Sequence, residues 1–345
     1  MTSIREWLEI YSTDQISLFI GIFVGLLFGA LAQQSRFCLR AATVEFWRGQ
    51  AGGKLAIWLF TFASALMLTQ WLIMGQVLDT EDIRQLATTG SISGAIIGGS
   101  LFGMGMILAR GCASRLLVLA ATGNQRALIA GLIVTLVSQA SLRGGLSPAR
   151  QAASSWWTIS PEQRNLAQYL PEYSAMIFAL LMLLVATYMV RHLKIRTWHW
   201  LGAIGVGAVI SLGWGLTAWH ASWSFDIVAV KSVSFTGPSA DTLMGLINSP
   251  HIPITFDIGI VMGVFTGALI AALLAGEFKI QGFTEQTGLA RYIIGATLMG
   301  FGGMLAGGCA VGAGITGGAV LALTAWLALL AMWLSAGITD FLIDR

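Results

Sequence analysis

The chain has 345 residues, of which 56% are hydrophobic and only 10% are charged, and its net charge is +3. A soluble globular protein carries about a quarter charged residues. This composition therefore excludes a water-soluble fold and indicates an all-α integral membrane protein, and the small net charge gives no indication of a nucleic-acid partner.

The amino-terminal stretch does not resemble a cleaved, positively charged leader. The first fourteen residues contain Glu6, Glu9 and Asp14 against a single basic residue, Arg5. A signal peptide begins with a basic region, so we expect no cleaved signal peptide here.

Nine apolar segments follow, each close to the ~20 residues that a bilayer-spanning helix needs. They are residues 15–32, 54–75, 91–110, 125–142, 173–191, 200–219, 255–276, 289–307 and 317–339. Glycines recur at helical spacing in several of them, as at Gly21, Gly25 and Gly29, which is typical of closely packed membrane helices. We expect a single membrane domain over residues 1–345.

One stretch of the chain occurs twice. Residues 98–113 (GGSLFGMGMILARGCA) match residues 295–310 (GATLMGFGGMLAGGCA) at a shift of 197 positions. Both copies end in Gly-Cys-Ala, as Gly111-Cys112-Ala113 and as Gly308-Cys309-Ala310, and the chain has only three cysteines. We expect repeat one over 15–142, a connector helix at 173–191 and repeat two over 200–339.

The number of spans decides how the two repeats are oriented. Five spans begin between the start of the first repeat and the start of the second, so the second copy is inverted relative to the first. Inverted repeats are common in transporters, where the substrate site lies at the repeat interface near the bilayer midplane. A miscount of one span would make the repeats parallel instead.

Four segments are too short to cross a bilayer and are predicted to be re-entrant half-helices. They are Cys38–Trp47, Ala113–Thr122, Pro238–Ile247 and the stretch AVGAGITGG after Cys309. Thr236 and Gly237 precede Pro238 in the third, which suits a helix start. Phe37 and Cys38 also align loosely with Phe235 and Thr236; this match is either repeat-related or accidental.

Basic residues predict the topology. Six of the 19 Lys and Arg residues fall on the amino-terminal side of the spans and thirteen on the other, with a basic cluster at 191–196. Under the positive-inside rule the amino terminus is outside (periplasmic) and the carboxyl terminus cytoplasmic.

Helix amino termini that converge at the bilayer centre would attract an anion, because their N–H groups are unpaired and carry partial positive charge. We expect this without a buried Lys or Arg. The candidate path-lining residues are Cys38, Cys112, Cys309, Gly111, Ala113, Gly308, Ala310, Thr236 and Gly237. An odd cysteine count without CxxC disfavours a structural disulfide, and no histidine cluster indicates zinc. We expect no metal and no cofactor.

Three motifs resemble one family. SRFCLRAA at 35–42, GMGMILARGCASRLLVLAATG at 103–123 and GGMLAGGCAVGAG at 302–314 are similar to the YeeE/YedE family of bacterial inner-membrane sulfur-transport proteins. The resemblance implies an hourglass-shaped transporter that passes thiosulfate along Cys38, Cys112 and Cys309, with a cytoplasmic TusA-like sulfur carrier as partner. A selenium-metabolism branch shares the motifs.

Two other classes stay open at this stage. A membrane thiol enzyme could relay sulfur covalently if nearby Arg36, Arg110 or Arg115 stabilised thiolates. A structural or partner-binding membrane protein would leave the repeated cysteines unexplained. No nucleotide-binding loop and no chain of acid and base residues across the spans indicates how transport is energised.

Overall fold

The computed structural model describes residues 12–50, 52–171, 173–248, 254–282 and 288–344. Residues 1–11, and with them most of the stretch expected not to be a leader, lie outside the described residues. The long helices are α2 (Thr13–Ser35), α4 (Gly53–Met74), α6 (Ile92–Leu108), α8 (Gln125–Arg143), α11 (Ser174–Leu193), α12 (Thr197–Trp223), α14 (Phe256–Leu274), α15 (Leu289–Leu305) and α17 (Leu323–Ile343).

The described residues thus contain nine candidate membrane spans, as the sequence predicted. Most predicted boundaries lie within a few residues of the observed ones. The ninth span is the exception, because α17 begins at Leu323 and not at 317. Leu321 adopts a left-handed conformation (φ 57°) and its N–H donates to Gly318 O, so the chain turns before the helix starts. Every residue around this turn is apolar or glycine, so hydropathy could not mark it.

Each of the four predicted short segments forms a short helix. These are α3 (Leu39–Trp47), α7 (Ala113–Ala121), α13 (Thr236–Asn248) and the π-helix η3 (Ala310–Thr316), which continues into α16 (Gly317–Ala319). α13 begins two residues before Pro238, and proline is tolerated there because first-turn N–H groups have no partner within the helix. That these helices are re-entrant stays a prediction.

The loops carry small elements that the sequence did not indicate. They are α5 (Arg84–Ala87), α9 (Ser147–Ser155), α10 (Pro161–Arg164), the 3-10 helix η1 (Leu166–Gln168), and strands β1 (Gly90–Ser91) and β2 (Thr158–Ile159). The two strands are antiparallel, with Gly90 opposite Ile159 and Ser91 opposite Thr158. They join the start of α6 to the segment before α11.

The helix packing is regular under one exchange of elements. Each helix of the first half can be assigned, in chain order, to one helix of the second half, and most pairs of helices in contact then correspond to a pair that is also in contact. The first half is α2, α3, α4, α6, α7 and α8, and the second half is α12, α13, α14, α15, η3 and α17. The contact of α2 with α14 becomes that of α12 with α4, and α6 with α17 becomes α15 with α8. α6 and α15 contact each other, as do α2 and α12. This pattern is what a two-fold relation between the two halves would produce; the inverted repeat itself stays a prediction.

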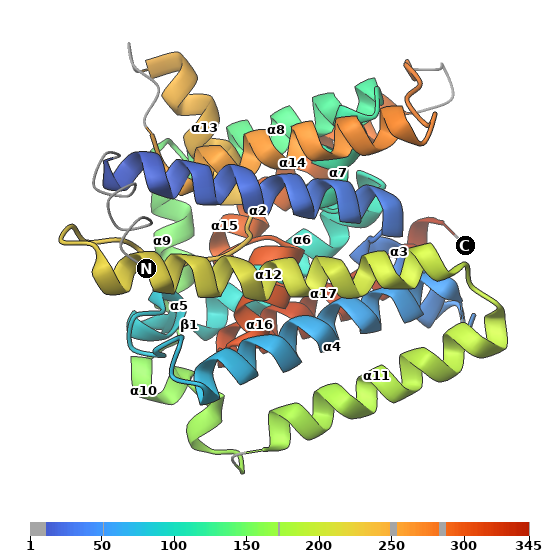
Figure 1. The fold of residues 1–345 in the computed structure, drawn as a ribbon. Helices are drawn as coiled ribbons and strands as arrows, with labels where there is room; N and C mark the ends of the chain where they lie inside the picture. The colour runs from blue at the N-terminus through green and yellow to red at the C-terminus, as the bar shows by residue number, and fades with distance from the viewer. Residues whose placement is uncertain (1–11, 51, 172, 249–253, 283–287, 345) are drawn as a thin grey trace.

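Figure 1 shows how these helices are arranged. α2, α12 and α4 run alongside one another across the view, α2 beginning at the left, while α11 lies at the periphery and packs on α4. The α2–α14 contact depends on glycine. A Cβ at Gly25 would lie 2.6 Å from Ile260 O, and Gly21 and Gly29 are equally close to the α14 backbone. The predicted packing role of these glycines is confirmed.

Candidate functional site

All three cysteines occupy the same local position. Cys38, Cys112 and Cys309 are the residues that immediately precede α3, α7 and η3, and all have extended backbone conformations. Cys112 and Cys309 are fully buried and Cys38 is partly buried; all three are free thiols. The prediction that the cysteines begin the short helices is therefore confirmed.

The chain reaches Cys112 and Cys309 by the same backbone route. Gly111 N–H donates to Met106 O (3.1 Å), and Gly308 N–H donates to Gly303 O (2.8 Å), each bond closing the preceding long helix. The two bonds are related by the 197-residue shift. The N–H groups that follow Gly111, Gly308 and Gly237 are predicted to face the substrate path, whereas the N–H groups of Gly111 and Gly308 themselves are engaged in these turns.

The positions just before these glycines also correspond. Arg110 and Gly307 both adopt left-handed conformations, with φ of 56° and 83°. The repeated glycine and cysteine therefore follow from one turn geometry used twice.

Each cysteine sulfur lies over the N–H group three residues further on, where a capping oxygen usually lies. The N–H groups are those of Ala41, Arg115 and Gly312. Only the bond from Gly312 N–H to Cys309 Sγ, at 3.4 Å, has full hydrogen-bond geometry. A thiol is a weak acceptor compared with Ser, Thr, Asp or Asn. A sulfur cap therefore satisfies the first-turn N–H groups less strongly than an oxygen cap would.

The short helices meet in two pairs. The thiols of Cys38 and Cys112 lie close enough to interact electrostatically, which brings the start of α3 near the start of α7. Ser114 Oγ lies 3.4 Å from Cys112 Sγ. The sulfur of Cys309 lies near the N–H groups of Phe235 and Thr236, which brings the start of η3 near the start of α13.

One small cavity lies between the starts of α7 and α13, and none of the three cysteines lines it. It has a volume of about 180 Å³ and lies between α7, α8, α13 and α14, with Ala113 and Thr236 both in its lining. α7 and η3 also contact each other directly. The space beside Gly237 is open, since a Cβ there would meet nothing within 4 Å. Ala310, in contrast, is buried at the start of η3.

Thr236 is the most distinctive polar residue at this point. Its side chain is almost completely buried, and its hydroxyl oxygen has no hydrogen-bond partner among the described residues. A buried hydroxyl without a hydrogen-bond partner is energetically costly. Its position at the helix start beside Cys309 therefore favours a ligand that forms the missing hydrogen bond. Thr236 is the residue that aligned with Cys38 in the sequence.

One of the three arginines named from the sequence lies close to two of the thiols. Arg115 lies one turn into α7, and its guanidinium is within electrostatic range of the thiols of both Cys38 and Cys112. Its Nη1 atom is buried and has no hydrogen-bond partner among the described residues. The Arg115 side chain as a whole is only partly buried, so the expectation of a positive site without a buried Lys or Arg stays a prediction. Arg115 is three residues from Cys112 in the sequence, whereas its proximity to Cys38 depends on the tertiary fold.

An ion pair at the end of α2 lies within electrostatic range of Arg115. Arg36 and Glu277 form an ion pair of 2.9 Å, and Gln33 Nε2 donates to the same carboxylate at 2.8 Å. The Arg36 guanidinium, by donating this bond, lowers the pKa of Glu277 below its usual value. Within the described part of the chain, no group of three or more His, Cys, Asp or Glu side chains is arranged to hold a metal ion.

Comparisons with known proteins identify the family of this chain. Residues 34–338 match the family described as "Sulphur transport". The chain is 26% identical over 343 residues to the thiosulfate transporter TsuA of Escherichia coli K12, covering 94% of both chains. It is 28% identical over 328 residues to the thiosulfate transporter TsuA of Spirochaeta thermophila, covering 90% of this chain and 94% of the relative.

Proposed function

This chain belongs to the sulphur-transport family, a family of transporters and not of enzymes, and on that premise we propose that it takes up thiosulfate. It is a multi-pass membrane protein. In the proposal, thiosulfate passes a central constriction lined by Cys38, Cys112 and Cys309 and by the starts of α3, α7, α13 and η3. The names of the two relatives support thiosulfate as the substrate.

The observation that carries the proposal is the position of the three thiols. Each replaces a strong oxygen cap at the start of a short helix. The helix ends offer N–H donors and partial positive charge to the oxyanion end of thiosulfate. The thiols offer weak donors and polarizable contacts to its terminal sulfur. The arrangement therefore suits an anion that is hard at one end and soft at the other.

We propose noncovalent passage in two steps. The ion first meets Thr236 and Cys309, where the unpartnered hydroxyl donates to it, and then meets Cys112 and Cys38, where Arg115 balances its charge. Several weak sites in series let an ion enter and leave, whereas one tight site would hold it. The direction follows the proposed topology, with the amino terminus in the periplasm, the carboxyl terminus in the cytoplasm and the chain in the inner membrane.

The domain plan is part of the same proposal. We infer one membrane domain over 1–345, with inverted repeats at 15–142 and 200–339 joined by the connector at 173–191. The exchange of helix contacts supports it, as does the shared turn before Cys112 and Cys309. The hourglass shape and re-entrant short helices belong to this plan.

Uptake of labelled thiosulfate into liposomes that contain only this protein tests the function. Cys112→Ala and Cys309→Ala should abolish or strongly reduce uptake, and Cys112→Ser should retain thiosulfate uptake poorly while admitting sulfate. Thr236→Asp and Ala113→Asp should stop uptake, because they place negative charge at the helix starts. Each variant is first compared with wild type in thermal stability. Wild-type uptake by both aspartate variants would exclude the anion path.

Two alternatives are separated by direct measurements. A covalent sulfur relay would leave a persulfide or thiosulfonate on one of the cysteines. Mass spectrometry of protein quenched with an alkylating agent during turnover detects such an adduct, and its formation and decay at the transport rate would replace passage by a relay. A selenium-compound transporter would prefer selenite or selenosulfate over thiosulfate in competition assays.

We also propose a cytoplasmic TusA-like sulfur carrier as partner. The support is the family resemblance. Co-purification of such a carrier with the membrane-embedded protein, and not with empty vesicles, tests the partnership; an equal signal from both would exclude it.

A further inference from the structure

A large polar cavity lies apart from the thiols. It has a volume of about 670 Å³ and is bounded by the carboxyl-terminal end of α8, by α13 and by the start of α14. α13 lies at the end of the bundle where α2 begins, at the left of Figure 1. The lining of the cavity includes four charged side chains from separate parts of the chain, namely Arg143, Lys231, Asp241 and Asp257. No sequence motif joins these four residues, so this cluster could not be predicted from the chain alone.

We propose that this cavity is a proton-linked entry site for a small divalent oxyanion, thiosulfate in the first place, in which Arg143 binds the anion and Asp241 is the group that takes up the proton. The inference rests on the proposed function for the identity of the anion. It adds a site, and a coupling to protons, that the cysteine path does not contain.

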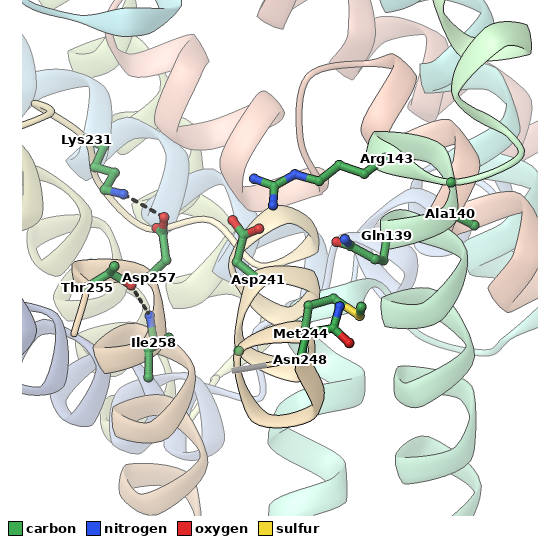
Figure 2. A pocket seen from close by; sticks show the side chains of 12 residues that line it. Gln139, Ala140, Arg143, Lys231, Asp241, Met244, Asn248, Thr255, Asp257 and Ile258 are labelled. Atoms are coloured by element: carbon green, nitrogen blue, oxygen red, sulfur yellow. Dashed lines mark hydrogen bonds and ion pairs between the residues drawn. The ribbon is translucent and has the colours of Figure 1, made fainter. Parts of the chain in front are cut away.

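The charges in the cavity are unequally paired. Lys231 Nζ and Asp257 Oδ2 form an ion pair of 2.6 Å, so these two charges largely compensate each other. The guanidinium of Arg143 forms no hydrogen bond or ion pair within the described ranges of the chain. Figure 2 shows it extended across the cavity toward Asp241. Guanidinium forks suit oxyanions, and this one is available.

Asp241 decides the charge of the cavity. When it is ionised, the four side chains sum to zero; when it is protonated, the cavity has one net positive charge and a carboxyl O–H donor. The ionised Asp241 carboxylate opposes a dianion bound beside it, whereas the protonated carboxyl and the net positive charge of the cavity favour the dianion. Partial burial raises the pKa of Asp241 above its usual value, and the negative charge of Asp257 raises it further.

The charged groups that act on Asp241 come from four parts of the chain. Arg143 on α8, Lys231 before α13 and Arg84 on α5 favour its ionised form, and Asp257 on α14 opposes it. An anion bound to Arg143 adds negative charge and withdraws a positive one from Asp241, so the carboxyl takes up a proton. Linkage is reciprocal, so the affinity for the anion rises as the pH falls through the titration range of Asp241 and is lower above that range.

The first measurement is calorimetric titration of the full-length protein with sodium thiosulfate between about pH 5 and about pH 8, in buffers of different ionisation enthalpy. We expect net uptake of up to about one proton per anion and tighter binding at lower pH. Binding that is independent of pH, without proton uptake in any buffer, would overturn the inference with no variant needed.

Two variants assign the effect to the cavity. Asp241→Asn should remove the proton uptake and bind at every pH as the wild type binds at low pH. Arg143→Gln should weaken binding about tenfold or more, as expected for loss of hydrogen bonds to a charged group, and Arg143→Lys should recover part of it. Glu162→Gln, an exposed acid of α10 outside the cavity, is the matched control and should behave as wild type. An Asp241→Asn protein that keeps the wild-type proton uptake would exclude Asp241.

The two proposals fail in different ways. Liposome uptake of thiosulfate that is unchanged in Arg143→Gln and Asp241→Asn leaves the function standing and excludes the entry site. Proton-linked binding that depends on both residues, without any thiosulfate uptake, leaves the cavity site standing and excludes the proposed function.

Discussion

Gly98 of α6 packs directly on the backbone of Gly302 in α15: a Cβ at Gly98 would lie 2.6 Å from Gly302 O. The contact recurs with the halves exchanged, since a Cβ at Gly295 would lie 2.8 Å from Gly105 O. The 197-residue shift converts one pair into the other. The repeated glycines thus hold α6 and α15 together on both sides of their crossing, and these helices lead directly to Cys112 and Cys309.

Adding a methyl group at this crossing should therefore separate the two helices. Gly98→Ala and Gly295→Ala should each destabilise the protein by about 1–3 kcal/mol. Thermal unfolding in detergent measures it. Gly131→Ala in α8 is the control, since nothing lies within 4 Å of its added Cβ, and it should be neutral or slightly stabilising. Equal melting of Gly98→Ala and Gly131→Ala would contradict the close packing.

A buried carboxylate makes Arg48 important for stability. Arg48 donates two hydrogen bonds of 2.8 Å to Asp340, whose side chain is 1% exposed. Arg48→Ala should cost about 3–5 kcal/mol, because it leaves a buried charge without its partner. Arg191→Ala, at the exposed end of α11, should cost little. Replacement of both partners, as Arg48→Met with Asp340→Leu, should recover much of the loss; no recovery would indicate another cause.

The unpartnered hydroxyl of Thr236 should matter for transport and not for folding. Thr236→Val removes it at nearly constant shape, so we expect unchanged or higher thermal stability with lower thiosulfate uptake. Thr236→Ser should keep most of the uptake. Measurements in liposomes at equal protein content decide, and full uptake by Thr236→Val would show that no ligand uses this hydroxyl.

Arg115 should act on the anion through its charge. Arg115→Gln should lower uptake about tenfold, the effect of one lost hydrogen bond to a charged group, while Arg115→Lys should retain an intermediate rate. Since the Nη1 atom has no partner among the described residues, thermal stability should not fall. Arg196→Gln, an exposed residue before α12, is the control. If Arg115→Gln lowered the melting temperature together with thiosulfate uptake, Arg115 would have a structural role.

The ion pair between Arg291 and Asp344 predicts a pH effect. Arg291 donates to Asp344 at 2.7 and 2.9 Å and thereby holds the pKa of this carboxyl below its usual value of 3.8. The depressed pKa contributes stability above about pH 4 that is lost as the pH falls further. Asp344→Asn should lower the melting temperature near neutral pH, and the melting temperature of this variant should fall less steeply than that of the wild type as the pH drops below about 4. Asp82→Asn, on an exposed loop, should leave the curve unchanged.

Much of the membrane fold could be predicted from local composition. A span needs only a long apolar run, so eight of the nine predicted segments begin within a few residues of the observed helices. The predicted start of the ninth span at residue 317 was wrong because the turn at Leu321 consists of apolar residues and cannot be distinguished from a span by hydropathy. Cys112 and Cys309 could be placed at helix starts because a short turn with glycine precedes each, which is a local property; the turn before Cys38, Ser35-Arg36-Phe37, contains no glycine.

The sequence by itself determined the class of the protein, its helices, its repeated Gly-Cys motif and its family. Which residues of the site lie next to each other was decided only by the tertiary structure. Cys38 with Cys112, Cys309 with Thr236, Arg115 beside two thiols, and Arg143 facing Asp241 each join residues from different elements. Hydropathy measures how apolar each segment is along the chain, whereas these contacts depend on how the helices cross. The crossings follow from close packing at residues such as Gly98 and Gly302, and no local pattern encodes their outcome.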